Sequence, residues 1–220
     1  MTSRICVAAN CTSPVASTYS PHCKRHKSTL RRHGAPDQRG VTKAEIAPYL
    51  ARIEARIAKN PDSEAGPLME AAWSAIVAEA QVGSCRRIGN RYDRSAADQI
   101  TAIASDASPR AVIVTVLAII ALWAERPRRF ASDDALRVQL ARRVRGLSQR
   151  HVGLRYDHRI GRQVRVYREL TPKAAAILGR ILMTALGGGG PQLAAIEARD
   201  REAAQLAKQA ASMTTKKPVK

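Results

Sequence analysis

The sequence predicts a mostly α-helical protein of the α+β class, with one small β-hairpin and a short cysteine-rich module at its N-terminus. Of its 220 residues, 45% are hydrophobic, which is enough to bury a core. Only 4% are aromatic, and the many alanine, leucine, isoleucine and valine residues favour helices packed through aliphatic side chains. Three of the four cysteines fall within the first 23 residues, so this segment is expected to fold around its own centre.

Two stretches carry most of the formal net charge of +19. Residues 24–33 hold five lysines and arginines and no acid, and residues 137–168 hold ten arginines and a single acid, Asp157. Together they account for +14 of the net charge. Solubilising charge is normally interspersed with acids, whereas a clustered cationic field concentrates polyanions. Nucleic acid is therefore the expected partner, and an anionic membrane surface is the weaker alternative.

The apolar patterning predicts a cytoplasmic protein without a membrane span. The longest apolar stretch, residues 111–124, has 14 residues, whereas a spanning helix needs about 20, so it is expected to be a buried core helix. The apolar patch at residues 5–9 is too short for a signal-peptide core. Cytoplasmic thiols stay reduced, so grouped cysteines are more consistent with metal ligands than with disulfides.

The N-terminal spacing is C-x4-C-x11-C-x2-H, formed by Cys6, Cys11, Cys23 and His26. Zinc prefers four sulfur and nitrogen ligands in a tetrahedron, and here a loop supplies two and the first turn of a helix supplies two. A polar segment of 36 residues has few other means to offset its ordering entropy. The sequence therefore predicts one structural Zn²⁺ bound by these four residues.

A helix is predicted from about residue 21 to residue 33. Ser20 is a natural N-cap, Pro21 suits the first helical position, and Gly34 followed by Pro36 ends the pattern. On this helix Cys23, His26 and Leu30 share the inward face.

Other side chains near the predicted ligands are less suited to the metal. His22 is the main rival for the fourth position, but it would point nearly 100° away from Cys23 around the helix. His33 is expected to act at the C-terminus of the helix, and Cys85 is expected to be a buried or free thiol.

Residues 20–36, SPHCKRHKSTLRRHGAP, together with the upstream cysteine pair, resemble the small treble-clef-type zinc modules of phage and bacterial HNH-associated proteins. The resemblance implies zinc ligation by Cys6, Cys11, Cys23 and His26 and contact of the module with DNA. It does not extend to nuclease activity, because Asp157 and His158 are not followed by the asparagine and histidine of an HNH site. The remainder resembles uncharacterised proteins of alphaproteobacteria and their phages, which implies no function.

Residues 37–94 are expected to form a linker and a helical segment. A Gly, Pro and Asp-containing linker covers residues 34–40, and a helix follows at about 42–59. Thr42 and Glu45 form a capping box, but Pro48 lies inside the pattern. The regular helix is therefore expected to begin either at the capping box or at Pro48. Another helix is expected at about 67–82, followed by a basic loop.

Residues 95–186 are expected to form a helical domain. Helices are predicted at about 95–105, 110–125 and 133–147, the third opened by Ser132, and a last core helix runs from Pro172 to about Leu186 after the cap Thr171.

A basic β-hairpin is predicted within residues 151–170. Its alternation of apolar and polar residues indicates one apolar face and one basic face. Three helices followed by a basic hairpin also match the order of a winged helix-turn-helix, with helix 133–147 as the reader. The connection at residues 125–132 is long for that fold, so a generic α+β core is the other arrangement considered.

The predicted organisation is a zinc-binding module at 1–36, a linker and helical segment at 37–94, a helical domain at 95–186, and a glycine linker, exposed helix and basic tail at 187–220.

The leading interpretation is a non-enzymatic protein of phage or bacterial origin that carries a structural zinc ion and binds nucleic acid, foremost double-stranded DNA. It is expected to be cytoplasmic and associated with the nucleoid. An HNH-like endonuclease or nuclease accessory subunit is one alternative, and an RNA-binding or nucleic-acid-packing protein is another. No catalytic residue is assigned, because no group of carboxylates and histidines has the spacing of a catalytic metal site. The residues expected to contact nucleic acid are Lys24, Arg25, Lys27, Arg31, Arg32, Arg142, Arg143, Arg145, Arg155 and Arg165.

Overall fold

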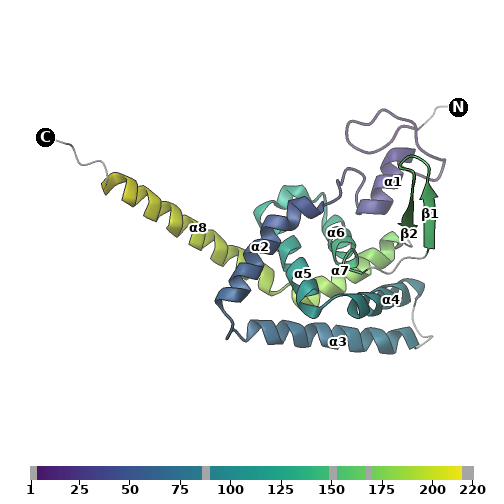
Figure 1. Cartoon of the computed structure of the whole chain (residues 1–220). Coiled ribbons are helices and arrows are strands. Elements are labelled where there is room, and N and C mark those ends of the chain that lie inside the picture. Colours follow the sequence, from purple (N-terminus) through teal and green to yellow (C-terminus); the bar gives the residue numbers. More distant parts are fainter. Residues whose placement is uncertain (1–3, 86–89, 149–152, 167–169, 215–220) are drawn as a thin grey trace.

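The computed structural model describes residues 4–85, 90–148, 153–166 and 170–214 (Figure 1). Helices dominate, and the described strands form one antiparallel hairpin, which confirms the predicted mostly helical α+β class. The elements in chain order are α1 (Lys24–His33), α2 (Lys43–Lys59), α3 (Ala65–Cys85), α4 (Arg91–Asp106), α5 (Pro109–Glu125), a 3-10 turn (Pro127–Arg129), α6 (Asp133–Arg145), β1 (Gly153–Asp157), β2 (Arg162–Val166), α7 (Pro172–Leu186) and α8 (Gly189–Thr214).

Helix α5 is the centre of the hydrophobic core. Its residues from Val112 to Leu122 are all buried, and α2, α3, α6, α7 and α8 pack against it (Figure 1). One hydrophobic cluster contains buried side chains from Val41 to Leu186. It includes residues on both sides of the boundary predicted between residues 94 and 95. The apolar stretch predicted as a buried core helix is therefore confirmed as one, while the predicted domain boundaries stay a prediction.

Within the described residues, no single helix combines the length and the apolar character needed to cross a membrane. Helices α4 and α5 meet that test only as a pair, and the chain bends by 120° between them.

Helix α2 begins at its capping box. The Thr42 hydroxyl accepts a hydrogen bond from the Glu45 backbone N–H at 3.1 Å, and the Glu45 carboxylate accepts one from the Thr42 N–H at 3.3 Å. These bonds satisfy N–H groups that a helix start leaves without partners. The helix therefore begins at Lys43, directly after the capping residue Thr42, and Pro48 lies inside it.

Other caps follow the sequence closely. The Ser132 and Thr171 side chains accept hydrogen bonds from the first turns of α6 and α7, as predicted. Helix α4 starts at Arg91 and not near residue 95, because the Asn90 side chain accepts hydrogen bonds from the backbone of the next residues. Helix α3 extends beyond both predicted ends, over Ala65–Cys85.

The β-hairpin does not separate apolar from basic residues. Its register places Arg155 opposite Val164. Residues directly opposite each other project from the same face of a two-stranded sheet, so a basic and an apolar residue share one face. The predicted apolar and basic faces are therefore wrong, and Leu154 and Tyr156 are exposed.

The structure does not confirm a winged helix-turn-helix. The predicted reader helix, α6, buries seven of its residues and packs against α1, α4, α5 and α7. A reader helix must leave one long face open to enter a DNA groove. Most of α6 is instead covered by neighbouring helices.

The N-terminal module joins the core where α1 ends against α6. Gly34 ends α1 in the left-handed conformation, with φ of 88°, and a Cβ there would collide with the backbone of Ala135. Gln139, which is only 1% exposed, donates to the His33 carbonyl at 3.2 Å and accepts from the Val41 N–H at 2.9 Å. One buried amide of α6 thus binds the chain on both sides of the connection between α1 and α2.

The connection predicted as a linker is anchored at further points. The buried Gln38 side chain accepts a hydrogen bond from the Ala131 N–H at 3.0 Å. The Arg129 guanidinium donates to the Arg39 and Gly40 carbonyls and pairs with the Glu45 carboxylate. The hydrogen bonds from Arg129 lower the pKa of Glu45, although partial burial acts in the opposite direction. Residues 34–41 are therefore part of the folded structure.

Helix α8 extends away from the body (Figure 1). It starts within the predicted glycine linker and spans Gly189–Thr214, inside residues 187–220, for which a linker, an exposed helix and a basic tail were predicted. An ion pair between Arg56 and Asp200, at 3.3 Å, joins it to α2. The predicted basic tail after Thr214 lies outside the described residues.

Replacing Gly179 with alanine is expected to destabilise the protein, because α7 crosses α6 at this residue. A Cβ at Gly179 would overlap the Arg137 backbone carbonyl. Such overpacking costs about 1–3 kcal/mol, which lowers the Tm of a chain this size by about 2–12 °C. Gly66→Ala is the control, because a Cβ at Gly66 meets nothing within 4 Å. Thermal unfolding curves that are the same for both variants would contradict the close crossing.

Candidate metal centre

A tight turn brings the first two cysteines together. The Cys6 N–H donates to the Ser13 carbonyl at 3.0 Å, and the Cys11 N–H donates to the Ala8 carbonyl at 3.1 Å. Asn10 takes a positive φ of 57°, which closes the turn. The thiols of Cys6 and Cys11 are therefore returned to the same side of the loop.

The start of α1 supplies the other two side chains. Cys23 is the N-cap residue, and its sulfur accepts a hydrogen bond from the His26 backbone N–H at 3.5 Å. His26 lies in the first helical turn, and its side chain and that of Cys23 both point to the loop.

The predicted start of this helix at Pro21 with Ser20 as the cap is wrong. The Ser20 hydroxyl instead forms a local turn with His22. The carbonyls of Pro21 and His22 accept hydrogen bonds from Val7 and from Ala16, respectively. Because these carbonyls bind the N-terminal loop, they are not available to a helix, which begins only at residue 24.

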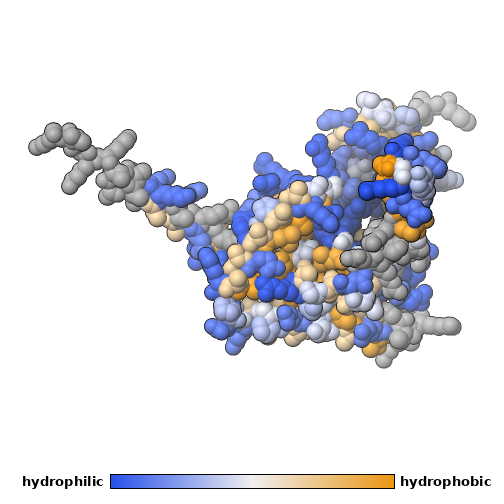
Figure 2. Space-filling model, viewed as in Figure 1, coloured by the Kyte–Doolittle hydropathy of each residue, from blue (hydrophilic) through white to orange (hydrophobic). Residues whose placement is uncertain are grey.

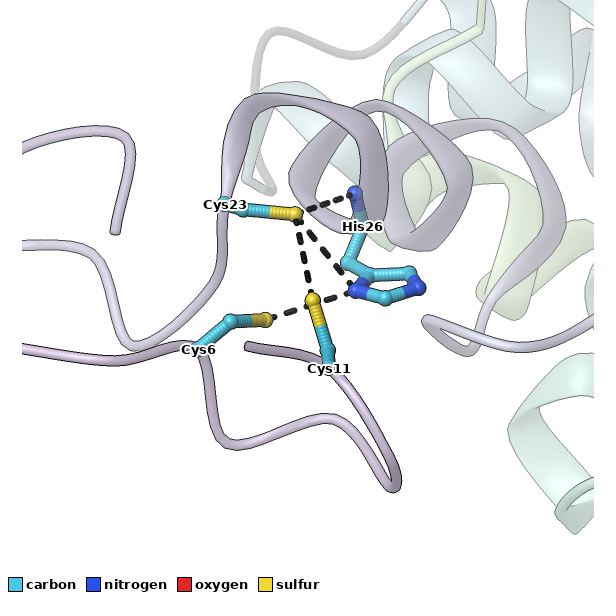
Figure 3. Close-up of side chains that lie close together, drawn as sticks. All are labelled: Cys6, Cys11, Cys23 and His26. Atoms are coloured by element: carbon cyan, nitrogen blue, oxygen red, sulfur yellow. Dashed lines mark hydrogen bonds between the residues drawn. The ribbon is translucent and has the colours of Figure 1, made fainter. Parts of the chain in front are cut away.

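Figure 3 shows the side chains of Cys6, Cys11, Cys23 and His26 gathered around one point. Their four ligand atoms all lie within 4.8 Å of one another. The His26 Nδ1 atom lies 3.3 Å from the Cys6 sulfur and 3.5 Å from the Cys23 sulfur. The Cys11 and Cys23 sulfurs are 3.9 Å apart. Tetrahedral zinc with ordinary bond lengths would separate sulfur from nitrogen by about 3.5 Å and two sulfurs by about 3.8 Å. The four predicted ligands can thus hold a metal ion.

His22 stays at the edge of this cluster. Its Nδ1 atom is 4.0 Å from the Cys6 sulfur, farther than the 3.3 Å that separates the same sulfur from the His26 Nδ1 atom. His22 does not belong to the cluster of four residues whose ligand atoms lie within 4.8 Å of one another. His22 precedes α1, so its position follows from the turn at Ser20. The predicted rotation of nearly 100° around a helix is therefore not the reason for it.

The Asp37 carboxylate faces the other side of the imidazole. The His26 Nε2 atom lies 3.5 Å from an Asp37 carboxylate oxygen, while Nδ1 faces the sulfurs. Metal-binding histidines commonly donate their second ring N–H to a carboxylate, which fixes the ring and its tautomer. Sequence reasoning missed Asp37, because only the folded connection after α1 returns it to His26.

The Cys6 thiol is poised as a thiolate. Burial raises its pKa, but hydrogen bonds from the Cys23 and Ala8 backbone and from the His26 and His22 side chains outweigh this effect. Together they lower the pKa from 9.0 to about 5. The thiolate is the form that binds a metal, so the fold prepares this ligand at neutral pH.

The donor set suits a structural ion. Three cysteine sulfurs and one imidazole would complete the tetrahedron around a zinc ion. They would leave no open position for the water or substrate that a catalytic zinc ion binds. Cys6, Cys23 and His26 are buried, and Cys11 is half-buried. Cys85 ends α3, and its side chain lies outside the described residues.

The ten predicted nucleic-acid contacts differ in exposure. All five cations of α1 are exposed, as are Arg142 and Arg155, and Figure 2 shows hydrophilic residues gathered over the end of the molecule that carries α1. Arg143 and Arg145 are half-buried, and burial together with the neighbouring Arg142 lowers the pKa of Arg143. The Arg165 side chain lies outside the described residues. Four of the ten, Arg31, Arg32, Arg142 and Arg145, line one cavity.

No protein-family model matches the chain, and no curated protein or solved structure is significantly similar to it. The geometry of the cysteine and histidine cluster and the distribution of charge are therefore the observations on which a function is argued.

Replacing Asp37 with alanine is expected to weaken metal binding, because the His26 ring loses the carboxylate on its outer side. Removal of such a partner costs about 10- to 100-fold in metal affinity, and the exposure of Asp37 favours the lower end. Competition with a chromophoric chelator measures the effect on Zn²⁺. Asp62→Ala removes an exposed carboxylate elsewhere and serves as the control. Equal affinities of the two variants would exclude this role of Asp37.

Acid is expected to weaken metal binding once the pH falls below about 5, because protons then compete with the metal for the Cys6 thiolate. Because folding lowers this pKa, the thiolate stabilises the module fully above pH 9.0 and progressively less from there down to about pH 5. His22→Ala removes one of the hydrogen bonds to Cys6 and should move the release to higher pH, whereas His158→Ala, an exposed control, should not. Metal release that is complete at pH 7 in the native protein would refute this expectation.

Proposed function

We propose that this chain is a nucleic-acid-binding protein whose N-terminal module is held by a structural zinc ion, and that its ligand is double-stranded DNA. The observation that carries the proposal is the double use of α1. Its first turn provides two of the clustered metal-ligand side chains, and its remaining surface carries five exposed cations without an acid. A metal ion at this place would fix the direction in which the cationic helix points.

The rigid mounting of α1 supports this proposal. The helix is held at its N-terminus by the cysteine and histidine cluster and at its C-terminus by Gln139 and Arg142, which donate to the His33 and Arg32 carbonyls. Cations on a rigid helix lose less conformational freedom when they meet phosphates than cations on a mobile tail. The net charge of +19 adds a long-range attraction to any polyanion.

The choice of duplex DNA rests on composition and surface chemistry. Proteins that bind single strands stack bases on aromatic side chains, and only 4% of this chain is aromatic. Lysine and arginine on a helix face suit the phosphates of a duplex and release its counterions. Such a protein is expected to associate with the nucleoid.

Charge reversal on α1 is expected to weaken duplex binding. Fluorescence anisotropy with a labelled 20-bp duplex, about two helical turns, would compare Lys24→Glu/Lys27→Glu with Arg199→Glu/Lys208→Glu, which makes the same charge change on α8. The α1 variant should lose at least about 10-fold in affinity, because repulsion replaces two phosphate contacts. Removal of zinc with a chelator should produce a comparable loss.

Equal losses for the two variants would refute the assignment of α1 as the contact surface. Failure of the zinc-loaded protein to bind any duplex at physiological salt would refute the proposed function. Competition with a structured RNA hairpin is the third arm, and a preference for the hairpin would replace DNA with RNA as the ligand.

A further inference from the structure

The β1–β2 hairpin buries none of its side chains from Gly153 to Val164, because each of these residues is exposed or half-buried. The hydrophobic core contains no residue of the two described strands. A two-stranded hairpin that covers no core is marginally stable in water. A partner that covers the hairpin would supply the stabilisation that the core does not.

Three exposed arginines of the hairpin have charges that no described residue neutralises. Arg155 lies in β1, Arg162 begins β2, and Arg159 lies in the turn between the strands. Within the described part of the chain, none of these three guanidinium groups forms an ion pair or a hydrogen bond. They are therefore available to an anionic partner.

The turn of the hairpin is fixed by its own hydrogen bonds. The Asp157 carboxylate accepts a hydrogen bond from the Arg159 N–H at 2.9 Å, and the Asp157 carbonyl accepts one from the Ile160 N–H at 3.3 Å. Gly161 takes a positive φ of 63°, which only glycine adopts without strain. Arg159 and Ile160 are exposed at this tip. Side chains on a fixed turn lose less conformational freedom when they bind.

The charge of the hairpin selects a polyanion as its partner. Residues 153–166 contain four arginines and one acid, Asp157, which gives a net charge of +3. Clustered cations of this kind attract the phosphates of nucleic acid. In Figure 1 the hairpin and α1 both lie at the end of the molecule away from the extended part of α8.

The mixed faces of the hairpin suit the edges of base pairs. Arg155 and Val164 share one face, and Tyr156 and Gln163 lie opposite each other on the other face. In the major groove of DNA, arginine binds the O6 and N7 atoms of guanine, glutamine binds adenine, and apolar side chains contact the thymine methyl group. A groove that presents acceptors, donors and methyl groups together matches such a mixture better than a hydrophobic core does.

The width of the hairpin distinguishes the two grooves. Paired strands lie about 4.8 Å apart, and side chains widen a ribbon to about 10 Å. The major groove of B-DNA is about 12 Å wide and admits a two-stranded ribbon, whereas the minor groove is about 6 Å wide. A hairpin of this kind therefore fits the major groove.

We propose that the β1–β2 hairpin enters the major groove of duplex DNA, where Arg155, Arg159 and Arg162 contact base edges and phosphates. This inference rests on the proposed function, because it takes the same ligand, and it adds a second contact surface to that of α1. The hairpin reads the base pairs, and the cations of α1 contact phosphates. The arrangement differs from a winged helix-turn-helix, because α6 does not enter the groove.

The first arm of the test measures the affinity of the zinc-loaded full chain for a labelled 20-bp duplex of mixed sequence by fluorescence anisotropy. Arg155→Gln/Arg159→Gln should weaken binding at least about 5-fold, the lower end of what one lost arginine contact to a base costs. Arg199→Gln/Lys208→Gln removes the same charge from exposed positions on α8. This control should lose less than about 2-fold, because salt screens charges that lie far from the contact. Circular dichroism and zinc stoichiometry verify folding; if the double variant does not fold, Arg159→Gln is compared with Arg199→Gln.

The second arm identifies the groove. The ratio of the native affinity to that of Arg155→Gln/Arg159→Gln is measured again on the same duplex with its guanines methylated at N7, and on the unmodified duplex saturated with distamycin, which fills the minor groove. Guanine N7 lies in the major groove, so methylation should reduce the ratio to less than about 2-fold. Distamycin should leave the ratio at about 5-fold or more, because it does not occupy the major groove.

The outcomes separate this inference from the proposed function. If the duplex binds but the hairpin variant behaves like its α8 control, the hairpin inference is overturned and the proposed function stands. A ratio that methylation leaves unchanged, or that distamycin abolishes, also overturns the inference, because the hairpin then does not act from the major groove. If the native protein binds no duplex, both fail. A loss in the hairpin variant that methylation removes and distamycin does not supports the inference, whatever the result for Lys24→Glu/Lys27→Glu.

Discussion

The convergence of three cysteine sulfurs and one imidazole nitrogen is the constraint on which the N-terminal part of the protein depends. The module has almost no hydrophobic core of its own, because its buried apolar cluster consists of Cys6, Ala8 and Cys23 with Cys11 beside them. Large apolar residues such as Val7 and Tyr19 are exposed. Hydrogen bonds such as that between Val7 and Pro21 offset part of the ordering entropy, and a metal ion held by the four clustered side chains would offset a further part.

The same constraint reaches the rest of the molecule through α1. Two cluster residues lie at the start of this helix, and its last residues bind Gln139 and Arg142 of α6. An uncompensated buried amide is costly, so Gln139 ties the position of the module to the packing of the core. The cationic surface of α1 is consequently fixed in position relative to the arginines of α6. The two cannot be treated as independent binding surfaces.

Local signals in the sequence predicted much of the fold. The caps at Thr42, Ser132 and Thr171 act within three residues, and the apolar stretch of α5 needs only its own composition to be recognised as core. The four residues of the candidate metal centre could also be predicted, because sulfur and imidazole chemistry limits which residues can gather around an ion. Errors arose where a distant segment competes for a local group: the carbonyls of residues 21 and 22 bind the N-terminal loop, which delays the start of α1.

The sequence by itself determined which elements form, where most helices begin, which four residues gather at the candidate metal centre and that the chain is strongly cationic. Only the tertiary structure decided that Asp37 returns to His26, that the segment after α1 is anchored by buried glutamines, that the hairpin faces are mixed and that four arginines line one cavity. Caps and ligand spacing act over a few residues, whereas these contacts join residues from 11 to about 110 positions apart. Their partners are set by how helices pack and how strands align, which no local pattern encodes.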